Sequence, residues 1–233
     1  MRISRVVARE TEWSRRQAIV AIEEGKVRVD GVEVKDPGLL VEEGSTIQVG
    51  SMEIPVQSFA SSISSARLFL AHKLPGEVVS WHDPEGRVTL FDRLQAMGVP
   101  SGLNSVGRLD LLSEGLLLLT DDGAVKRYLE HPGNRIQRVY RARVQGDIEP
   151  WMIDARERGS DSDEEQLRPM SVVVQSSRGK THWLRIVLDE GRNREIRRAM
   201  DHLGLRCDRL IRTQYGPYHL KQAGPRGAVT EAK

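Results

Sequence analysis

The sequence predicts a mixed α+β protein in which a small helix-helix-hairpin module precedes a larger domain with a mixed, mostly antiparallel sheet. Three observations lead to this prediction. Apolar residues at helical spacing give way to short alternating runs within residues 1–50. Small and polar residues fill positions 58–65, which is typical of a linker. After them, strand and helix patterns are mixed, and 233 residues suffice for two separate cores.

Two helices open the module. Ile3, Val6 and Val7 recur at helical spacing, and Ser14 with Gln17 three residues later is a capping-box pattern at the start of a second helix. The spacing predicts that this second helix buries one stripe of side chains, formed by Ala18, Ile19 and Ile22.

The second helix is predicted to end at Gly25. Arg15 and Arg16 lie in its exposed first turn, near the positive end of the helix dipole. The amide groups and the dipole at such a helix end favour anions, so the two arginines indicate a phosphate site.

A β-hairpin follows the helices. Residues 27–29 and 32–34 alternate between apolar and polar, and Asp30-Gly31 between them is a type I′ turn signal. A further short strand at 46–49 closes the unit. The predicted boundaries are residues 1–57 for the module, 58–66 for the linker and 67–233 for the larger domain.

The larger domain is predicted to combine strands with a few helices. Residues 115–120 contain four consecutive leucines between turn residues, a pattern typical of a strand buried on both faces. Asp121-Asp122-Gly123 then begins a short helix that ends before Pro132. Further strands are predicted at 68–72, 78–81 (after the Pro75-Gly76 turn), 139–144 and 183–188.

The periodicity of two predicted elements assigns their side chains to one face or the other. A helix over about 193–203 turns an inner face toward the core, made of Ile196, Met200 and Leu203. Alternation in the strand at 139–144 separates Tyr140, Ala142 and Val144 on one face from Val139, Arg141 and Arg143 on the other.

The net charge of +2 conceals an uneven distribution. Acidic residues gather at 161–165, whereas between 192 and 212 only Glu195, Asp201 and Asp208 oppose a cluster of arginines. Its members are Arg192, Arg194, Arg197, Arg198, Arg206, Arg209 and Arg212. A local field of this sign favours a nucleic-acid partner.

Several classes of protein are disfavoured. No apolar run approaches the roughly 20 residues that cross a bilayer, so no membrane association is expected. The first residues show no secretory or transit peptide, although an earlier presequence would have left no trace. Cys207 is the single cysteine and the six histidines lack paired spacing, which predicts no internal disulfide, no metal and a reducing compartment.

Asp110 is the first candidate for chemistry. It lies in a short loop between Gly107 and Gly115, directly before the predicted buried strand, and such a loop presents one side chain to a cleft. An aspartate in this setting is also commonly a turn former or a helix cap, so the loop alone leaves both interpretations open.

The arginine-rich segment at 190–198 is the second candidate. Its guanidinium groups are suited to binding phosphate. The alternative is a solvated helix face without a ligand.

Three strings together resemble a known family: GRLDLLSEGLLLLTDDG at 107–123, EGRNREIRRAMDHLG at 190–204, and Leu210-Ile-Arg212 followed by Gly216-Pro217. They are similar to the ribosomal RNA pseudouridine synthases of the RsuA/RluB type. The first segment, with SRRQAI at 14–19 and GKVRVDG at 25–31, resembles the S4-type RNA-binding domain of those enzymes. The resemblance covers nearly the whole chain.

The resemblance implies a role for each matching residue. Asp110 corresponds to the nucleophile that frees the uracil, which rotates and rejoins through carbon 5, by attack on the anomeric carbon or through a glycal. Tyr140 corresponds to the residue that stacks on the base, and Arg197 to the partner of the catalytic carboxylate. The implied substrate-binding residues are Arg108, Ile196, Arg192, Arg194, Arg198, Leu210 and Arg212. The implied RNA contacts of the N-terminal module are Arg2, Arg5, Arg15, Arg16 and Lys26.

Physical reasoning is consistent with these roles. An enzyme that acts on a base must unstack it, and an aromatic side chain such as Tyr140 compensates part of that cost, although a tyrosine packed in the core fits the same pattern. A guanidinium beside Asp110 would keep that carboxylate ionised. The isomerisation involves no redox step, so no cofactor is expected.

The chain departs from the family pattern at a few positions. Lys73-Leu74-Pro75-Gly76 differs from the usual Lys-Pro-x-Gly order, which leaves the role of Lys73 and Pro75 open. Arg138, Glu195 and Asp30 stand where lysine, glutamine and asparagine are common.

The expected function is conversion of one uridine of ribosomal RNA to pseudouridine, and the protein is expected to be a monomer when free. Its partner would be ribosomal RNA or an assembling subunit. Chain length mildly favours the small subunit, although the motif wording also fits large-subunit relatives. The expected compartment is the bacterial cytoplasm, or the mitochondrial matrix or plastid stroma if a presequence was removed. The alternatives are a non-catalytic ribosome-assembly protein with the same fold and, ranked last, a hydrolase using Asp110, for which no partner acid or histidine is evident.

Overall fold

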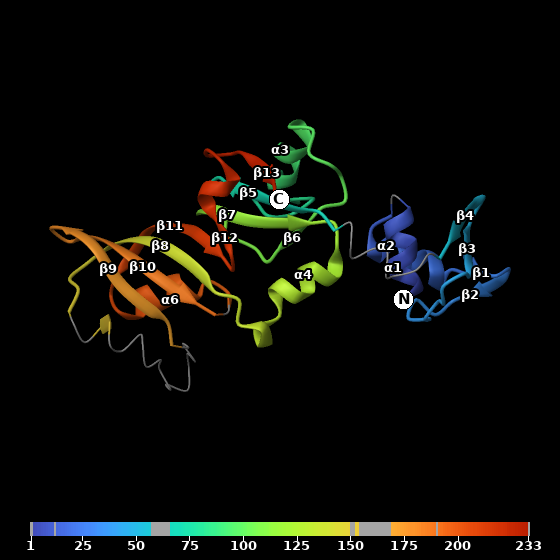
Figure 1. The fold of residues 1–233 in the computed structure, drawn as a ribbon, viewed down its shortest axis with the longest axis horizontal. Coiled ribbons are helices and arrows are strands. Elements are labelled where there is room, and N and C mark those ends of the chain that lie inside the picture. Colours follow the sequence, from blue (N-terminus) through green and yellow to red (C-terminus); the bar gives the residue numbers. More distant parts are fainter. Residues whose placement is uncertain are drawn as a thin grey trace. The chain divides into compact units, whose positions relative to one another are not determined.

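The computed structural model describes residues 2–11, 13–56, 66–149, 152–153, 169–189 and 191–232 (Figure 1). The chain divides into two compact units, residues 1–66 and 67–233. The predicted linker at 58–66 lies outside the described residues except for Ala66. Among the described residues, no helix has the length and apolar character needed to cross a membrane.

The first unit packs two helices against a four-stranded antiparallel sheet of order β2-β1-β3-β4 (Figure 1). Its elements are α1 (Ile3–Glu10), α2 (Arg15–Glu23), β1 (Val27–Val29), β2 (Val32–Val34), β3 (Thr46–Val49) and β4 (Met52–Pro55). The capping box forms, since the Ser14 amide donates to Gln17 Oε1 at 2.7 Å and the Gln17 amide donates to Ser14 Oγ at 3.3 Å. Asp30 and Gly31 have φ angles of 49° and 82°, as a type I′ turn requires.

The predicted stripe of α2 is wrong at one position. Ala18 and Ile22 are fully buried, but Ile19 is only half-buried and Ala21 takes its place. α1 packs against α2, whose buried residues are Ala18, Ala21 and Ile22. The sequence pattern did not predict β4. Only Ile54 of its four residues is buried, and one of the four is a proline.

In the second unit, nine strands of the described residues form one sheet (Figure 1). The main order is β13-β5-β7-β11-β8-β10-β9, with β6 paired to β7 and β12 paired to β11. The strands are β5 (Leu68–Lys73), β6 (Asn104–Val106), β7 (Ser113–Thr120), β8 (Arg138–Gln145), β9 (Ser171–Arg178), β10 (Thr181–Leu188), β11 (Arg206–Tyr215), β12 (Tyr218–His219) and β13 (Val229–Glu231). Only the β7 and β11 pair is parallel, so the expected mixed, mostly antiparallel sheet is confirmed.

Helices cover this sheet: α3 (Leu90–Ala96), α4 (Gly123–Glu130) and α6 (Glu195–His202), with short 3-10 turns η3 (Pro132–Asn134) and η4 (Leu220–Ala223). All eight residues of β7 are buried, as its run of leucines predicted. Leu117 and Leu119 pack with α3, while Leu116 and Leu118 pack with Leu129 of α4. The strand is therefore covered on both faces.

The predicted strand at 78–81 is wrong. Val78 makes a single parallel bridge to Thr89, and the intervening chain is a loop. Trp81 stacks on Phe91 of α3 with ring centroids 4.2 Å apart, and Arg87 makes a bidentate ion pair with Asp83. These side-chain contacts, rather than a strand partner, hold the segment.

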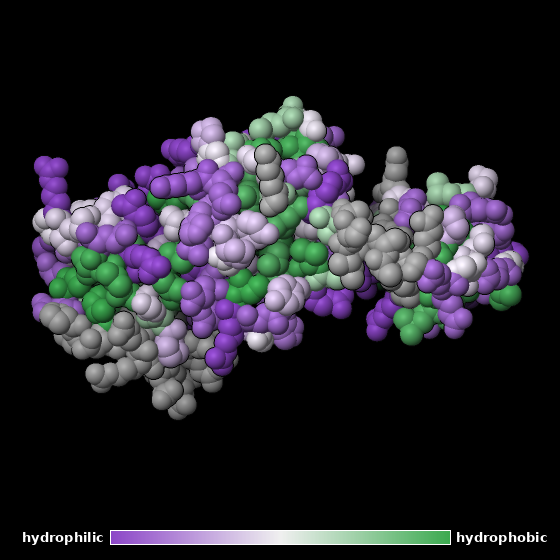
Figure 2. Space-filling view, viewed as in Figure 1, coloured by the Kyte–Doolittle hydropathy of each residue, from purple (hydrophilic) through white to green (hydrophobic). Residues whose placement is uncertain are grey.

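The half of the sheet made of β8, β10 and β9 has one covered face. Ile196 and Met200 of α6, with Leu203 just after it, are buried against β8 and β10, as the sequence predicted. On the face shown in Figure 2, apolar residues gather over β9 and β10. Val173 and Val174 are the exposed large hydrophobic residues of β9.

Gly115 permits the parallel pairing of β7 with β11. Its φ of +108° is disfavoured for other residues, and an added Cβ would overlap the backbone carbonyl of Arg212. Gly115→Ala is expected to lower the free energy of unfolding by about 3 kcal/mol or more, because it adds a backbone clash to a strained φ. Urea denaturation measures this change.

The matched control is Gly179→Ala in the β9–β10 turn. Gly179 also has a positive φ, of +56°, but an added Cβ would meet no atom within 4 Å. This variant should lose only about 1 kcal/mol. Equal losses in both variants would show that the backbone angle, and not the close approach of β11, restricts position 115.

Candidate active site

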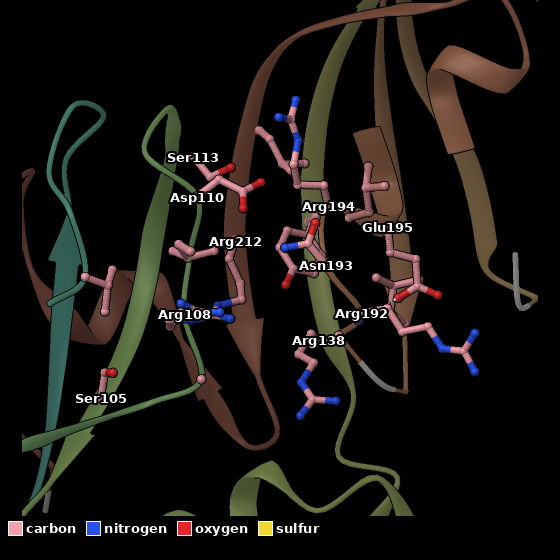
Figure 3. A pocket seen from close by; sticks show the side chains of 18 of the residues that line it. Ser105, Arg108, Asp110, Ser113, Arg138, Arg192, Asn193, Arg194, Glu195 and Arg212 are labelled. Carbon is pink, nitrogen blue, oxygen red and sulfur yellow. Dashed lines mark hydrogen bonds between the residues drawn. The ribbon is translucent and has the colours of Figure 1, made fainter. Parts of the chain in front are cut away.

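A cleft of about 750 Å³ opens in the second unit beside β8 and β11 (Figure 3). One side is the loop between β6 and β7, which carries Arg108 and Asp110, and the other is the segment before α6, which carries Asn193 and Arg194. The cleft thus joins two segments that lie about eighty positions apart in the chain. It also includes residues that the sequence did not single out as functional, namely Ser105, Lys126, Glu130 and Asn193.

Asp110 presents its carboxylate to this cleft. The side chain is 38% exposed, and the loop that carries it closes with the Ser113 amide donating to the Asp110 carbonyl at 2.9 Å. Asp110 Oδ2 lies 3.9 Å from Nε of Arg197, at the long limit of an ion pair. A carboxylate in this position can approach a bound ligand without first breaking a short hydrogen bond to Arg197.

Arg197 of α6 lies beside Asp110 but is not itself one of the residues that line the cleft. Its side chain is 11% exposed, and Nη1 donates to the Cys207 carbonyl at 2.8 Å, which fixes the guanidinium. Nη2 is buried and has no hydrogen-bond partner among the described residues. Because a buried unpaired N–H is costly, this group favours a nearby oxygen acceptor.

Lys73 holds the loop that carries Asp110. Its side chain is fully buried at the end of β5, and Nζ donates to the carbonyls of Ser113 at 2.7 Å, Asp110 at 3.1 Å and Leu111 at 3.3 Å. A fourth bond, of 3.0 Å, goes to the Leu74 carbonyl. One ammonium group therefore binds three carbonyls of the loop, and Lys73 acts as a positioning residue. The sequence left this role open because the motif around Lys73 departs from the family pattern. A lysine at the end of an apolar strand nevertheless indicates a buried ammonium group that needs several acceptors.

Burial lowers the pKa of Lys73 to about 8, while the nearby carboxylates of Glu77, Asp110 and Glu114 oppose the shift. The unfolded chain, with a pKa near 10.5, holds more protons than the folded protein between pH 8 and 10.5. The contribution of Lys73 to the free energy of unfolding therefore rises with pH across this window. The gap in unfolding free energy between wild type and Lys73→Met should widen by about 3 kcal/mol from pH 7 to pH 10.5. A constant gap in urea titrations would contradict the shifted pKa.

Tyr140 packs in the core and also borders the cleft. It is 7% exposed and packs in one core cluster with Ala142 and Val144, yet it also lines the cleft. Arg212 lies opposite it across the β8–β11 pairing and also lines the cleft. Arg212 Nε donates to the Leu116 carbonyl at 2.7 Å, while its Nη2 is buried without a partner among the described residues.

The other candidate residues take three kinds of position. Ile196 and Leu210 are buried at the cleft wall, and Arg108, Arg192 and Arg194 are exposed at its rim. Arg198 is half-buried on α6 and does not line the cleft, so the structure does not bring it to the others. Arg138, at the base of the cleft, donates to the Asp189 carbonyl and to the Tyr215 hydroxyl, each at 2.8 Å.

α4 supports the glycine that precedes Arg108. Glu130 Oε1 accepts a hydrogen bond of 2.6 Å from the Gly107 amide, and Lys126 lies 3.2 Å from the same carboxylate. Among the described residues, no group of three His, Cys, Asp or Glu side chains is arranged to hold a metal ion.

The arginines of the first unit are available for RNA. Arg2, Arg15 and Arg16 are exposed and Arg5 is half-buried. Lys26 instead pairs with Glu24 at 2.6 Å, so part of its charge is neutralised. This pairing makes Lys26 the weakest of the expected contacts.

Two family models match the chain. The model described as RNA pseudouridylate synthase matches residues 67–202, and the S4 domain model matches residues 1–47. The chain belongs to the RNA pseudouridylate synthase family. As an RNA pseudouridine synthase it is an enzyme that isomerises uridine in RNA, which confirms the sequence prediction of its class.

Relatives of this pseudouridine synthase align over almost its whole length. A ribosomal large subunit pseudouridine synthase B from Yersinia pestis is 34% identical, covering 99% of this chain and 72% of the relative. The protein of the same name from Escherichia coli K12 is 35% identical, with 99% and 78% covered. An uncharacterised RNA pseudouridine synthase from Rickettsia felis is 35% identical, with 99% and 96% covered.

A solved structure shares the fold of this synthase. A crystal structure of a pseudouridylate synthase superposes with a TM-score of 0.66, covering 100% of this chain and 96% of the other at 21% identity. At this identity the similarity establishes the fold.

Proposed function

We propose that this pseudouridine synthase converts a uridine of ribosomal RNA, with Asp110 as the nucleophile and with the target nucleotide flipped into the cleft. The observation that carries the proposal is the Asp110 carboxylate, open to a 750 Å³ cleft and 3.9 Å from the Arg197 guanidinium. A flipped base needs such a recess, because its reacting atoms are inaccessible within a stacked helix.

The reaction breaks the bond between C1′ and N1 of the uridine and forms a bond between C1′ and C5. The proton on C5 is lost and N1 gains one, so the product is an isomer and no electrons are gained or lost. Asp110 either bonds to C1′ and is later displaced, or assists formation of a glycal. In both routes a carboxylate is needed at the sugar, and the Arg197 guanidinium, 3.9 Å away, provides a counter-charge that orients it.

The other cleft residues are assigned by their positions. Tyr140 lies at the wall beside Ile196 and Leu210, where a flat uracil would contact both aromatic and aliphatic surface. Arg108 is exposed on the loop next to Asp110, where it can take the place of the everted nucleotide or hold its phosphate. Arg192, Arg194 and the buried N–H of Arg212 provide further donors.

Ribosomal RNA is the proposed substrate because the named relatives are ribosomal synthases. Their names refer to the large subunit, and this replaces the small-subunit preference that chain length had indicated. The relatives come from bacteria, which supports the bacterial cytoplasm as the compartment; nothing supports an organelle. An assembling subunit as the partner, and a monomeric state when free, stay predictions.

Transcripts of large-subunit and small-subunit RNA with tritium at C5 of uridine test the substrate. Release of about one tritium per large-subunit molecule, and none from the small subunit, is the expected result. Release from transfer RNA alone would exclude a ribosomal substrate. Carbodiimide-blocked primer extension on RNA from cells lacking the gene then identifies the modified position.

The N-terminal arginines should contribute to binding through phosphate contacts. Arg15→Ala with Arg16→Ala is expected to weaken RNA binding and to reduce the slope of log K against log salt by about 2, since fewer counterions are released. Lys35→Ala is the control, because Lys35 already pairs with Glu33 at 3.3 Å. An unchanged slope in the double variant, measured by filter binding, would remove both residues from the interface.

A further inference from the structure

The half-sheet of β8, β10 and β9 carries arginines with no acid among them. Each strand has eight residues, and none of the three contains an aspartate or a glutamate. The whole chain is nearly balanced, with 35 basic and 33 acidic residues. A local excess of this kind is a feature of the surface and does not follow from overall composition.

The arginines lie on the face opposite the core and the cleft. Tyr140 and Ala142 of β8 point to the buried side under α6, so Arg141 and Arg143 point to the other. Arg185 of β10 is paired directly with Arg141 of β8, and both side chains are exposed. Like charges directly opposite one another destabilise a sheet, so this pair favours an anionic ligand.

An aromatic ring supports the charged groups. The guanidinium carbon of Arg141 lies 4.5 Å from the centroid of the Trp183 ring, and Arg141 Nε donates to Gln175 Oε1 at 3.0 Å. Arg143 has a buried Nε without a hydrogen-bond partner among the described residues. Stacking leaves the edge of a guanidinium available, and part of Trp183 is also accessible.

Arg209 on the neighbouring strand, in contrast, has an acidic partner. Arg209 of β11 lies on the same side, opposite Arg143, and forms an ion pair with the buried Glu114. Among the described residues, Arg141, Arg143 and Arg185 have no acidic partner of this kind. We call these three arginines, together with Trp183, the basic sheet face.

We propose that the basic sheet face binds the backbone of RNA that lies beyond the target nucleotide. The inference rests on the proposed function, because it assumes an RNA longer than the segment in the cleft. Guanidinium groups beside an accessible aromatic ring are suited to phosphates and to an unpaired base at the same time. An acidic protein would match the charge but would leave the ring without a specific role.

The face and the cleft are separate surfaces. Arg141 and Tyr140 are adjacent in β8 but point to opposite sides of the sheet, so a short RNA hairpin held in the cleft does not reach the basic sheet face. Only a longer RNA that continues around the sheet contacts both. The two sites therefore respond differently to RNA length.

The test uses the full chain with Arg141→Gln and Arg185→Gln combined. Two RNAs carry tritium at C5 of uridine: a short hairpin around the modified position, and a ribosomal RNA fragment of several hundred nucleotides. The variant should convert the short hairpin at the wild-type rate. It should bind the long fragment about tenfold more weakly, and its salt slope should be smaller by about 2.

Two further variants control for charge and for folding. Arg141→Lys with Arg185→Lys keeps both charges and should retain most of the salt slope. Arg127→Gln with Lys221→Gln removes two exposed cations elsewhere on the same unit and should leave the slope for the long fragment nearly unchanged.

The outcomes separate this inference from the proposed function. If wild type converts neither RNA, the proposed function fails irrespective of the face. If wild type converts both and the glutamine variant binds the long fragment as tightly as wild type, RNA binding by the face is overturned, and an acidic protein becomes the better partner. Equal slope losses in the Arg127 and Lys221 variant would likewise overturn it.

Discussion

Asp110→Asn should bind its RNA as tightly as wild type and release no detectable tritium from C5-labelled uridine. Asparagine keeps the size of the side chain and its place 3.9 Å from Arg197, but it removes the charge and the nucleophilic oxygen. Loss of a nucleophile typically lowers turnover by at least about 10⁴-fold. Single-turnover release of tritium measures the rate, and filter binding measures the affinity.

The control for Asp110 is Asp189→Asn. The Asp189 side chain is exposed after β10 and does not line the cleft, so its replacement changes the net charge equally and leaves the backbone carbonyl that Arg138 binds in place. Its rate should stay within about twofold of wild type. Comparable release by Asp110→Asn and wild type would remove Asp110 from the chemistry. Loss of RNA binding in Asp110→Asn would instead indicate a role in folding of the loop.

Lys73→Met should have the largest effect on stability. Methionine fills a similar volume but cannot donate, so the carbonyls of Leu74, Leu111 and Ser113 lose a buried donor. Each unmatched carbonyl costs about 1–3 kcal/mol, and the change is offset in part because the buried ammonium is gone. A net loss of about 3 kcal/mol in the free energy of unfolding at pH 7 is expected from urea denaturation.

The same substitution should also slow catalysis in the protein that remains folded. Without the ammonium, the loop that carries Asp110 is no longer fixed to β5, and misplacement by about 1 Å costs about 10²-fold in rate. Lys180→Met is the control, since Lys180 is exposed in the β9–β10 turn, pairs with the exposed Asp147 and does not line the cleft. A stable Lys73→Met protein with wild-type turnover would show that the loop needs no such support.

Features that depend on neighbouring residues were predictable from the sequence. The capping box of Ser14 and Gln17, the Asp30-Gly31 turn and the buried leucines of β7 are each encoded within a few positions. The inner face of α6 was predicted for the same reason. The strand predicted at 78–81 failed because its apolar residues gave no information about the available partner, and Trp81 packs on Phe91 instead.

The candidate site was predictable only in part. Asp110, Tyr140 and Arg197 were selected by resemblance, since an aspartate in a glycine-flanked loop has several ordinary explanations. The role of Lys73 was left open, because three of its four carbonyl partners lie in a loop almost forty positions later. Arg198 was grouped with the cleft residues by its neighbours in sequence, but the helical period turns it away.

The sequence by itself determined the order of most helices and strands, the boundary signal between the two units and the membership of the family. Only the tertiary structure decided which side chains share the cleft, that Lys73 binds the loop of Asp110, and that Arg141, Arg143 and Arg185 lie together on an open face. The physical reason is that helix and turn signals act over a few residues, whereas a sheet brings together strands from distant parts of the chain. Their register, and the burial that follows from it, exists only in the folded protein.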